Sequence, residues 1–302
     1  MKSMFSEESG NKLKSAVLMT FFILIIGVLG GLLGFVYGNV YFGLAIAVIF
    51  SIFYSLFGFF AGSQMILGVS GAKPVTKKDY PYLYNTIEGL AVASGMPAPR
   101  AYVIDDSALN AFSTGRDPKN ASITVTTGLL KTMNRQELEG VIGHEMSHIK
   151  NYDIRVMMLT AVLIGVVVLL SDFLLRTFLW GGARRNRNDN SRGNQLQMIL
   201  IIAGLALAVL SPIISQLIQL AISRKREFAA DAGSAILTRY PPGLASALGK
   251  IAKDPDPLVD KANRATAHLF ISSPFRKTQG FFTNLFSTHP PIPERIKRLE
   301  EM

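Results

Sequence analysis

Two long apolar runs open the chain and predict a pair of membrane-spanning helices. The runs cover residues 16–37 and 41–64, and each supplies the roughly 20 residues that a spanning helix needs. The link between them, residues 38–40, is too short to hold a domain. Tyr37 and Tyr41 flank this link and fit the aromatic belt of a membrane interface. We therefore expect a tight helical hairpin.

A second pair of apolar runs covers residues 154–171 and 196–222. Pro212 predicts a kink in the last run rather than its end. The polar segment between the two runs, residues 181–194, contains few apolar residues and predicts a surface loop. The pattern therefore indicates a second hairpin and about four transmembrane helices in total.

The intervening sequence has the pattern of a globular α+β domain. Residues 79–93 predict a helix, and residues 100–104 and 122–126 predict short strands. Asn134 and Glu137 have the spacing of a capping box, which predicts the start of a further helix.

The second hairpin interrupts this globular domain, because residues 223–302 are again globular and mostly helical by pattern. The predicted fold is a mostly α membrane protein with an α+β domain in two parts. Its segments are an N-terminal hairpin (1–70), the first part of the domain (71–153), the second hairpin (154–222) and the second part (223–302).

Composition limits the chemistry that the chain can carry. Apolar residues make up 49% of the 302 positions, and the mean hydropathy of +0.31 supports a membrane part. The chain has no Cys, which excludes disulfides, thiolate nucleophiles and Cys-ligated zinc. A metal would have to be held by carboxylates and by the four His residues.

The charge pattern predicts an orientation in the membrane. A net charge of +10 fits positive loops beside spans, and no basic stretch with interleaved aromatics suggests a nucleic-acid partner. The positive-inside rule, with an even number of crossings, predicts that both termini and the globular domain lie in the cytoplasm. Basic residues on that side are Lys2, Lys12, Lys14, Lys73, Lys77, Lys78, Lys150, Arg155, Arg224, Lys225 and Arg226; those on the other side are Arg184, Arg185, Arg187 and Arg192.

The segment His144-Glu-Met-Ser-His148 carries the clearest chemical signal. On a helix, residues i and i+4 share a face, so two neutral imidazoles can bind one zinc ion. Glu145 then lies beside them as a general base. The alternative is a surface helix with two incidental histidines, but the motif uses two of only four in the chain.

A catalytic zinc needs a third protein ligand, and Glu227 is the best candidate. It lies in a helical stretch after the fourth apolar run, and Asp231 follows one turn later on the same face. A carboxylate there can accept a hydrogen bond from the free nitrogen of a ligating His. The alternative for both residues is an ordinary solvated helix face.

Four separated motifs together resemble the HtpX membrane proteases, bacterial relatives of the CAAX prenyl protease. The resemblance covers nearly the whole chain, including the placement of the two hairpins. The motifs are Asn110-Ala-Phe-Ser-Thr-Gly115, His144-Glu-Met-Ser-His148, Arg226-Glu-Phe-Ala-Ala-Asp231 and Ser287-Thr-His-Pro-Pro-Ile-Pro-Glu-Arg-Ile296.

The resemblance implies a gluzincin-like zinc protease domain with a role for each matching residue. It implies zinc bound by His144, His148 and Glu227, with Glu145 as the base and Asp231 behind the ligands. His289 and Arg295 match residues that lie near the zinc and help the transition state. Asn110 matches a residue on an edge strand, where a peptide substrate can add as a further strand.

Two of these residues have plainer interpretations, and one further histidine matches no motif. His289 lies in a Thr-His-Pro-Pro segment that is more typical of a turn with a surface histidine. Asn110 fits a turn residue equally well, and His268 matches no motif, which favours a surface or core position.

The sequence therefore predicts a membrane-integrated zinc endopeptidase with one Zn²⁺ per chain. The resemblance to the HtpX proteases implies its substrates, which are misfolded or damaged membrane proteins and unfolded proteins, and a role in stress-related quality control. The protein is expected to contact the lipid bilayer and to bind neither nucleic acid nor nucleotide. The alternatives are a prenyl-protein processing protease and a non-catalytic membrane scaffold or transporter that binds metal.

Overall fold

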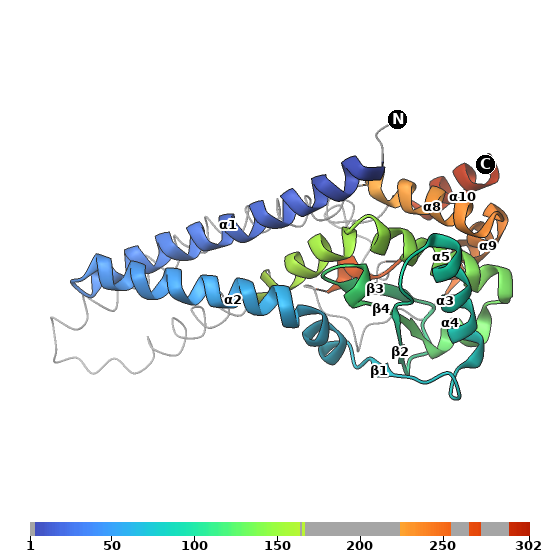
Figure 1. The fold of residues 1–302 in the computed structure, drawn as a ribbon, viewed down its shortest axis with the longest axis horizontal. Coiled ribbons are helices and arrows are strands. Elements are labelled where there is room, and N and C mark those ends of the chain that lie inside the picture. The colour runs from blue at the N-terminus through green and yellow to red at the C-terminus, as the bar shows by residue number, and fades with distance from the viewer. Residues whose placement is uncertain (1–3, 164, 167–223, 255–265, 273–289) are drawn as a thin grey trace.

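The computed structural model describes residues 4–163, 165–166, 224–254, 266–272 and 290–302. Figure 1 shows two long helices, α1 and α2, projecting from one side of a globular part that holds the sheet and the shorter helices. Helix α1 covers Met4–Val36 and α2 covers Val40–Val69. Both are long and apolar enough to cross a membrane, so the helices of the predicted first hairpin are confirmed.

Small residues bring the two helices of the hairpin close together. A Cβ atom on Gly30 would overlap that of Ala47 and come within 2.6 Å of the Gly43 carbonyl oxygen. A Cβ atom on Gly34 would lie 2.6 Å from the carbonyl oxygen of Asn39. Such small-residue contacts let membrane helices pack backbone to backbone.

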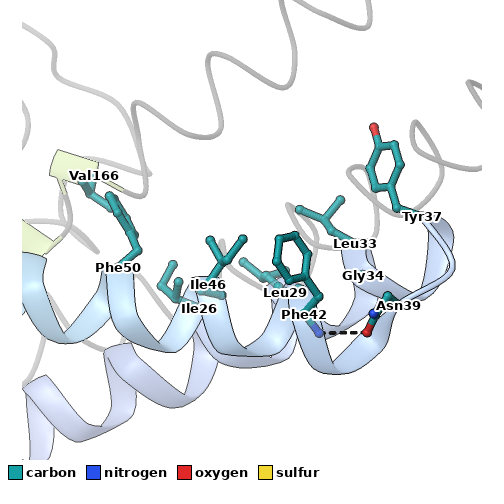
Figure 2. Close-up of a pocket in the computed structure, with 13 residues that line it drawn as sticks. Ile26, Leu29, Leu33, Gly34, Tyr37, Asn39, Phe42, Ile46, Phe50 and Val166 are labelled. Carbon is teal, nitrogen blue, oxygen red and sulfur yellow. Dashed lines mark hydrogen bonds between the residues drawn. The ribbon is translucent and has the colours of Figure 1, made fainter.

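The tip of the hairpin is a short turn. Gly38 has a φ of 84°, a left-handed value that glycine adopts without strain. Asn39 then caps α2, because its side chain accepts a hydrogen bond from the Phe42 N–H. Figure 2 shows this bond beside an apolar pocket along the hairpin, to which Ile26, Leu33 and Ile46 contribute.

The globular part is built on a four-stranded mixed sheet. The strands are β1 (Lys73–Pro74), β2 (Arg100–Ile104), β3 (Ala111–Gly115) and β4 (Ala121–Thr126), and their order is β1-β2-β4-β3. Strands β2 and β4 are parallel, and the other two pairs are antiparallel. The two strands predicted from the pattern are β2 and β4, and β3 lies at the edge of the sheet.

Both faces of the sheet are covered, so it forms the middle of three layers. Ala101 and Val103 of β2 belong to a core shared with the globular helices. Tyr102 and Ile104 point to the opposite face and pack with the end of α2 at Ile66 and with residues of the helix 153–163. The base of the hairpin is therefore part of a hydrophobic core.

The helices of the globular part cover the face of the sheet that carries Ala101 and Val103. Helix α5 begins at the predicted capping box: the Asn134 side chain accepts from the Glu137 N–H, and the Glu137 carboxylate accepts from the Asn134 N–H. The bounds are α3 (Pro81–Ser94), α4 (Thr127–Thr132), α5 (Arg135–Lys150), α8 (Arg224–Thr238), α9 (Pro241–Lys253) and α10 (Ile292–Glu300), with short 3-10 helices η1 (Pro118–Asn120) and η3 (Ala267–Leu269).

The predicted second hairpin lies largely outside the described residues. Residues 153–163 and 165–166, at the start of the third apolar run, are helical. The rest of that run, the polar loop and the whole fourth run are not among the described residues. The number of four spans therefore stays a prediction.

Candidate metal centre

Two helices carry the predicted metal ligands. His144, Glu145 and His148 lie on α5, and Glu227 and Asp231 lie at the start of α8. All five side chains are buried. Because the two helices pack against each other, residues about 80 positions apart in the chain share one interior site.

Glycine and serine residues allow this close packing. A Cβ atom on Gly143 of α5 would come within 2.9 Å of the Ser234 Oγ atom of α8. A Cβ atom on Gly233 of α8 would clash with the Ser147 side chain of α5. Ser234 also donates a hydrogen bond of 2.7 Å to the Gly140 carbonyl oxygen. These contacts fix the position of α8 along the axis of α5, so that Glu227 lies beside the two histidines.

The three predicted ligands converge on one point. The Nε2 atoms of His144 and His148 lie 3.2 Å apart. The Glu227 carboxylate lies 3.8 Å from the first nitrogen and 3.5 Å from the second. Bond lengths of about 2.0–2.2 Å in a tetrahedral zinc site give distances between ligand atoms of about 3.4 Å. The three donors therefore fit a single zinc ion.

Each imidazole is held by a carboxylate on its other nitrogen. Asp231 Oδ1 lies 3.0 Å from His144 Nδ1, and Asp153 Oδ2 lies 3.0 Å from His148 Nδ1. The sequence predicts a hydrogen bond to Asp231 from one of the two histidines without indicating which. An ionised carboxylate only accepts hydrogen bonds, so each Nδ1 atom donates its proton. In the neutral rings, both Nε2 lone pairs then face the same space. That arrangement requires a proton or a metal ion between them.

Asp153 is a site residue that the sequence reasoning missed. It follows the second histidine by five positions and lies just after the end of α5, where helical periodicity no longer applies. A carboxylate soon after the motif was the available signal. Its side chain also lies 3.4 Å from the Arg226 guanidinium.

Glu145, the predicted general base, also has a hydrogen-bond partner in the sheet. Ser113, on the edge strand β3, donates a hydrogen bond of 2.6 Å to Glu145 Oε2, and both side chains are buried. This contact orients the Glu145 carboxylate beside the ligands. Ser113 lies within the Asn110–Gly115 motif, but no local pattern indicates its contact with Glu145, because that contact joins a strand to a helix.

Arg295 of α10 lies behind the ligands, fully buried. Its guanidinium donates to both oxygens of Asp231, at 2.9 and 2.6 Å. It also lies 3.3 Å from His144 Nδ1 and 3.6 Å from Glu227 Oε2. The structure thus brings Arg295 to the site through the residues that hold the metal ligands.

Two further polar residues singled out from the sequence, Asn110 and His268, have different placements. Asn110 is buried before β3, where its amide donates a hydrogen bond of 3.1 Å to the Ser272 carbonyl oxygen. His268 is a core residue whose Nε2 atom lies 3.1 Å from the Met157 carbonyl oxygen, so the interpretation outside the site is confirmed. His289 is not among the described residues.

The buried charges shift two pKa values in opposite directions. Burial alone lowers the pKa of His148, but the hydrogen bond to Asp153 and the charges of Glu227, Asp153 and Glu145 raise it to about 9. Burial alone raises the pKa of Asp231, but the positive charge of Arg295 and the hydrogen bonds from His144 and Arg295 hold it below its ordinary value. In the protein without metal, Asp231 therefore stays ionised and His148 carries a proton at neutral pH.

Comparisons with known proteins agree with this geometry. The model of peptidase family M48 matches residues 77–302. The protease HtpX homolog of Tropheryma whipplei (strain Twist) is 44% identical over 299 residues, which cover 99% of this chain and 98% of the relative. The protease HtpX homolog of Dictyoglomus turgidum is 48% identical over 246 residues, which cover 82% of this chain and 77% of the relative.

A solved structure shows a related fold. The crystal structure of S. mikatae Ste24p matches with a TM-score of 0.52 at 17% sequence identity, and the match covers 99% of this chain and 66% of that one. At this identity the likeness concerns the fold alone. The family match, the two relatives and the clustered histidines and carboxylates agree with one another: the chain belongs to peptidase family M48, among the HtpX membrane metalloproteases.

Proposed function

We propose that this metalloprotease is a zinc endopeptidase that cleaves misfolded or damaged membrane proteins, as part of stress-related quality control. The observation that carries the proposal is the convergence of His144 Nε2, His148 Nε2 and the Glu227 carboxylate at 3.2 to 3.8 Å. One Zn²⁺ per chain is held by these three residues. When bound, zinc supplies Lewis-acid chemistry, which makes water more acidic and polarises a peptide carbonyl.

Glu145 takes the proton from the attacking water and passes it to the leaving amine nitrogen. Ser113 keeps the Glu145 carboxylate in place during this transfer, through the hydrogen bond to Oε2. Asp231 and Asp153 fix the tautomers of the two ligating histidines, and Arg295 fixes Asp231. Arg295 acts through these residues, whereas His289 is the candidate for direct contact with the transition state.

Substrate peptide adds to the sheet beside β3, the edge strand that begins next to Asn110. Asn110 supports this edge by holding the segment at Ser272 in place. The Ile271 N–H donates to the Ala111 carbonyl oxygen at 2.9 Å, so that segment already pairs with the first residue of the strand. The remaining length of β3 leads toward Ser113 and thus toward Glu145.

The protease domain lies at the cytoplasmic face of the bacterial inner membrane, with both termini on the same side and two hairpins crossing the bilayer. Two observations support this placement. The hairpin of α1 and α2 is long and apolar enough to span, and its base packs on the sheet. Lys73, Lys77 and Lys78 follow α2 directly, as the positive-inside rule requires of a cytoplasmic side.

The central test is the substitution Glu145→Gln in purified protein in detergent. We expect proteolysis of an unfolded protein to be abolished while zinc stays bound, because the ligands are retained and only the base is lost. Glu139→Gln is the matched control, since it makes the same change on the same helix at a residue paired with exposed Arg135. Removal of zinc by a chelator should also abolish cleavage. Full activity of Glu145→Gln would contradict the proposal.

A further inference from the structure

The first membrane helix reaches the metal centre through one buried amide. Asn11 of α1 is fully buried. Its Nδ2 group donates one hydrogen bond of 2.8 Å to Asp153 Oδ1 and another of 2.8 Å to the Asn151 carbonyl oxygen. Both amide protons are thereby used. The other oxygen of the same carboxylate, Asp153 Oδ2, lies 3.0 Å from His148 Nδ1. An unbroken chain of hydrogen bonds thus runs from α1 to a metal ligand.

The same part of α1 also holds the turn that carries Asp153. Tyr152 has a φ of 60°, which is uncommon for a residue with a side chain and is strained. Lys12 places its ammonium group 4.6 Å from the centre of the Tyr152 ring, a cation–π contact. Two consecutive residues of α1 therefore contact three consecutive residues of the turn, from Asn151 to Asp153.

This turn decides where Asp153 lies relative to α5. The helix ends at Lys150, so nothing in its own hydrogen-bond ladder directs Asp153 back toward His148. Tyr152, with its left-handed backbone, separates α5 from the helix that follows, and Asn11 donates to the Asn151 carbonyl oxygen before it and to the Asp153 side chain after it. Arg226 approaches Asp153 at 3.4 Å, a longer contact than that of Asn11.

We propose that Asn11 is a positioning residue of the metal centre. Through Asp153 it fixes the ring of His148 for metal binding, so that the first membrane helix is a working part of the site as well as an anchor. This inference rests on the proposed function, because it takes His148 as a zinc ligand.

The test measures zinc affinity in the full-length protein in detergent, by competition with a chelating indicator, together with the unfolding temperature. We expect Asn11→Ala to weaken zinc binding about tenfold, as loss of a partner behind a metal ligand does. Ser15→Ala is the matched control: it removes a buried hydrogen bond of 2.9 Å to the Asn11 carbonyl oxygen, within α1 and away from the turn. We expect its zinc affinity to stay within about twofold of the wild type.

A double-mutant cycle shows whether the effect passes through Asp153. In the Asp153→Asn background, Asn11→Ala should weaken zinc binding no further. An equal loss in both backgrounds, or an equal loss in Ser15→Ala, would overturn the inference. Asn11→Leu, which keeps the volume but not the donors, replaces Asn11→Ala if that variant does not fold.

The outcomes also separate this inference from the proposed function. If the wild type binds zinc no more tightly than His148→Ala, the proposed zinc site itself is wrong. If the wild type binds zinc through His148 but Asn11→Ala binds it equally well, only the role of Asn11 is wrong.

Discussion

Each of the two histidines of the site contacts a carboxylate through its Nδ1 atom, but different elements bind the two carboxylates. Asp231, which holds His144, is itself held by Arg295 from α10. Asp153, which holds His148, is approached by Asn11 from α1. Each ring is therefore fixed by an element distant in sequence. A change at a support residue should act on metal binding before it acts on the overall fold.

Substitution of Asp231 by Asn should weaken zinc binding by about 10- to 100-fold. An Asn side chain keeps the shape, but its NH2 group replaces one carboxylate oxygen, faces a donor of Arg295 or His144 and cannot accept from it. Competition with a chelating indicator measures the effect. The same change at exposed Asp79, which bonds only Thr76 in the described contacts, should leave the affinity unchanged. Wild-type affinity in Asp231→Asn would contradict this role.

Site residues that share one helix face could be predicted from the sequence, whereas contacts between separate elements could not. Spacing of three or four along a helix placed His144 with His148 and Glu227 with Asp231. Contacts such as Ser113 with Glu145 or Asn11 with Asp153 join separate elements, 32 and 142 positions apart. No local sequence pattern indicates such contacts, because they form only when the helices and the sheet pack together.

Helix α5 is the central element of the protease domain, and its start is fixed by charge. Glu137 closes the capping box and also accepts hydrogen bonds of 2.6 Å from Ser246 and from Lys250, both on α9. Although burial raises the pKa of Glu137, these hydrogen bonds outweigh it, and the pKa lies below its ordinary value. The cap therefore joins the motif helix to its neighbour.

The lowered pKa gives a stability that depends on pH. A glutamate with a depressed folded-state pKa stabilises the fold above its unfolded pKa of about 4.3, and this stabilisation is lost as pH falls through the folded value. Glu137→Gln should lower the free energy of unfolding by about 1–2 kcal/mol at pH 7. Denaturant titrations in detergent measure the difference in free energy of unfolding between the wild type and Glu137→Gln. This difference should become smaller below about pH 4. Glu88→Gln is the control, because Glu88 forms an exposed ion pair with Lys77. This change should lower the free energy of unfolding much less than Glu137→Gln does.

Elements with strong local signals were predicted well. The first hairpin and the start of α5 followed from apolar length and a capping box. Strand β3 had no such signal, because all five of its residues are buried and alternation is absent. It was expected only through the family resemblance of the segment that begins at Asn110.

At the scale of the whole molecule, the sheet joins the membrane part to the catalytic part. One face packs on the helices that carry the site, and the other packs on the base of α2 and on residues 153–163. The hairpin is thus a layer of the fold. Its direction of insertion fixes the side of the membrane on which the site faces.

Orientation can be tested with single cysteines, because the chain has none of its own. Tyr37→Cys lies at the hairpin tip, where the side chain is 73% exposed, and Lys78→Cys lies at an exposed position beyond α2. An impermeant maleimide added to spheroplasts should label the first variant and not the second. Disrupted membranes should label both, which confirms that each thiol can react. The reverse pattern would show that the domain faces the other side.

The position of Arg295 behind Asp231 and His144 also has a consequence for biosynthesis. Arg295 and His144 are 151 positions apart, and at about 5–20 residues per second a ribosome needs roughly 8 to 30 seconds to translate that interval. The histidine motif therefore emerges well before the arginine that completes its surroundings. We expect each new molecule to remain inactive until Arg295 has been translated and packs behind Asp231.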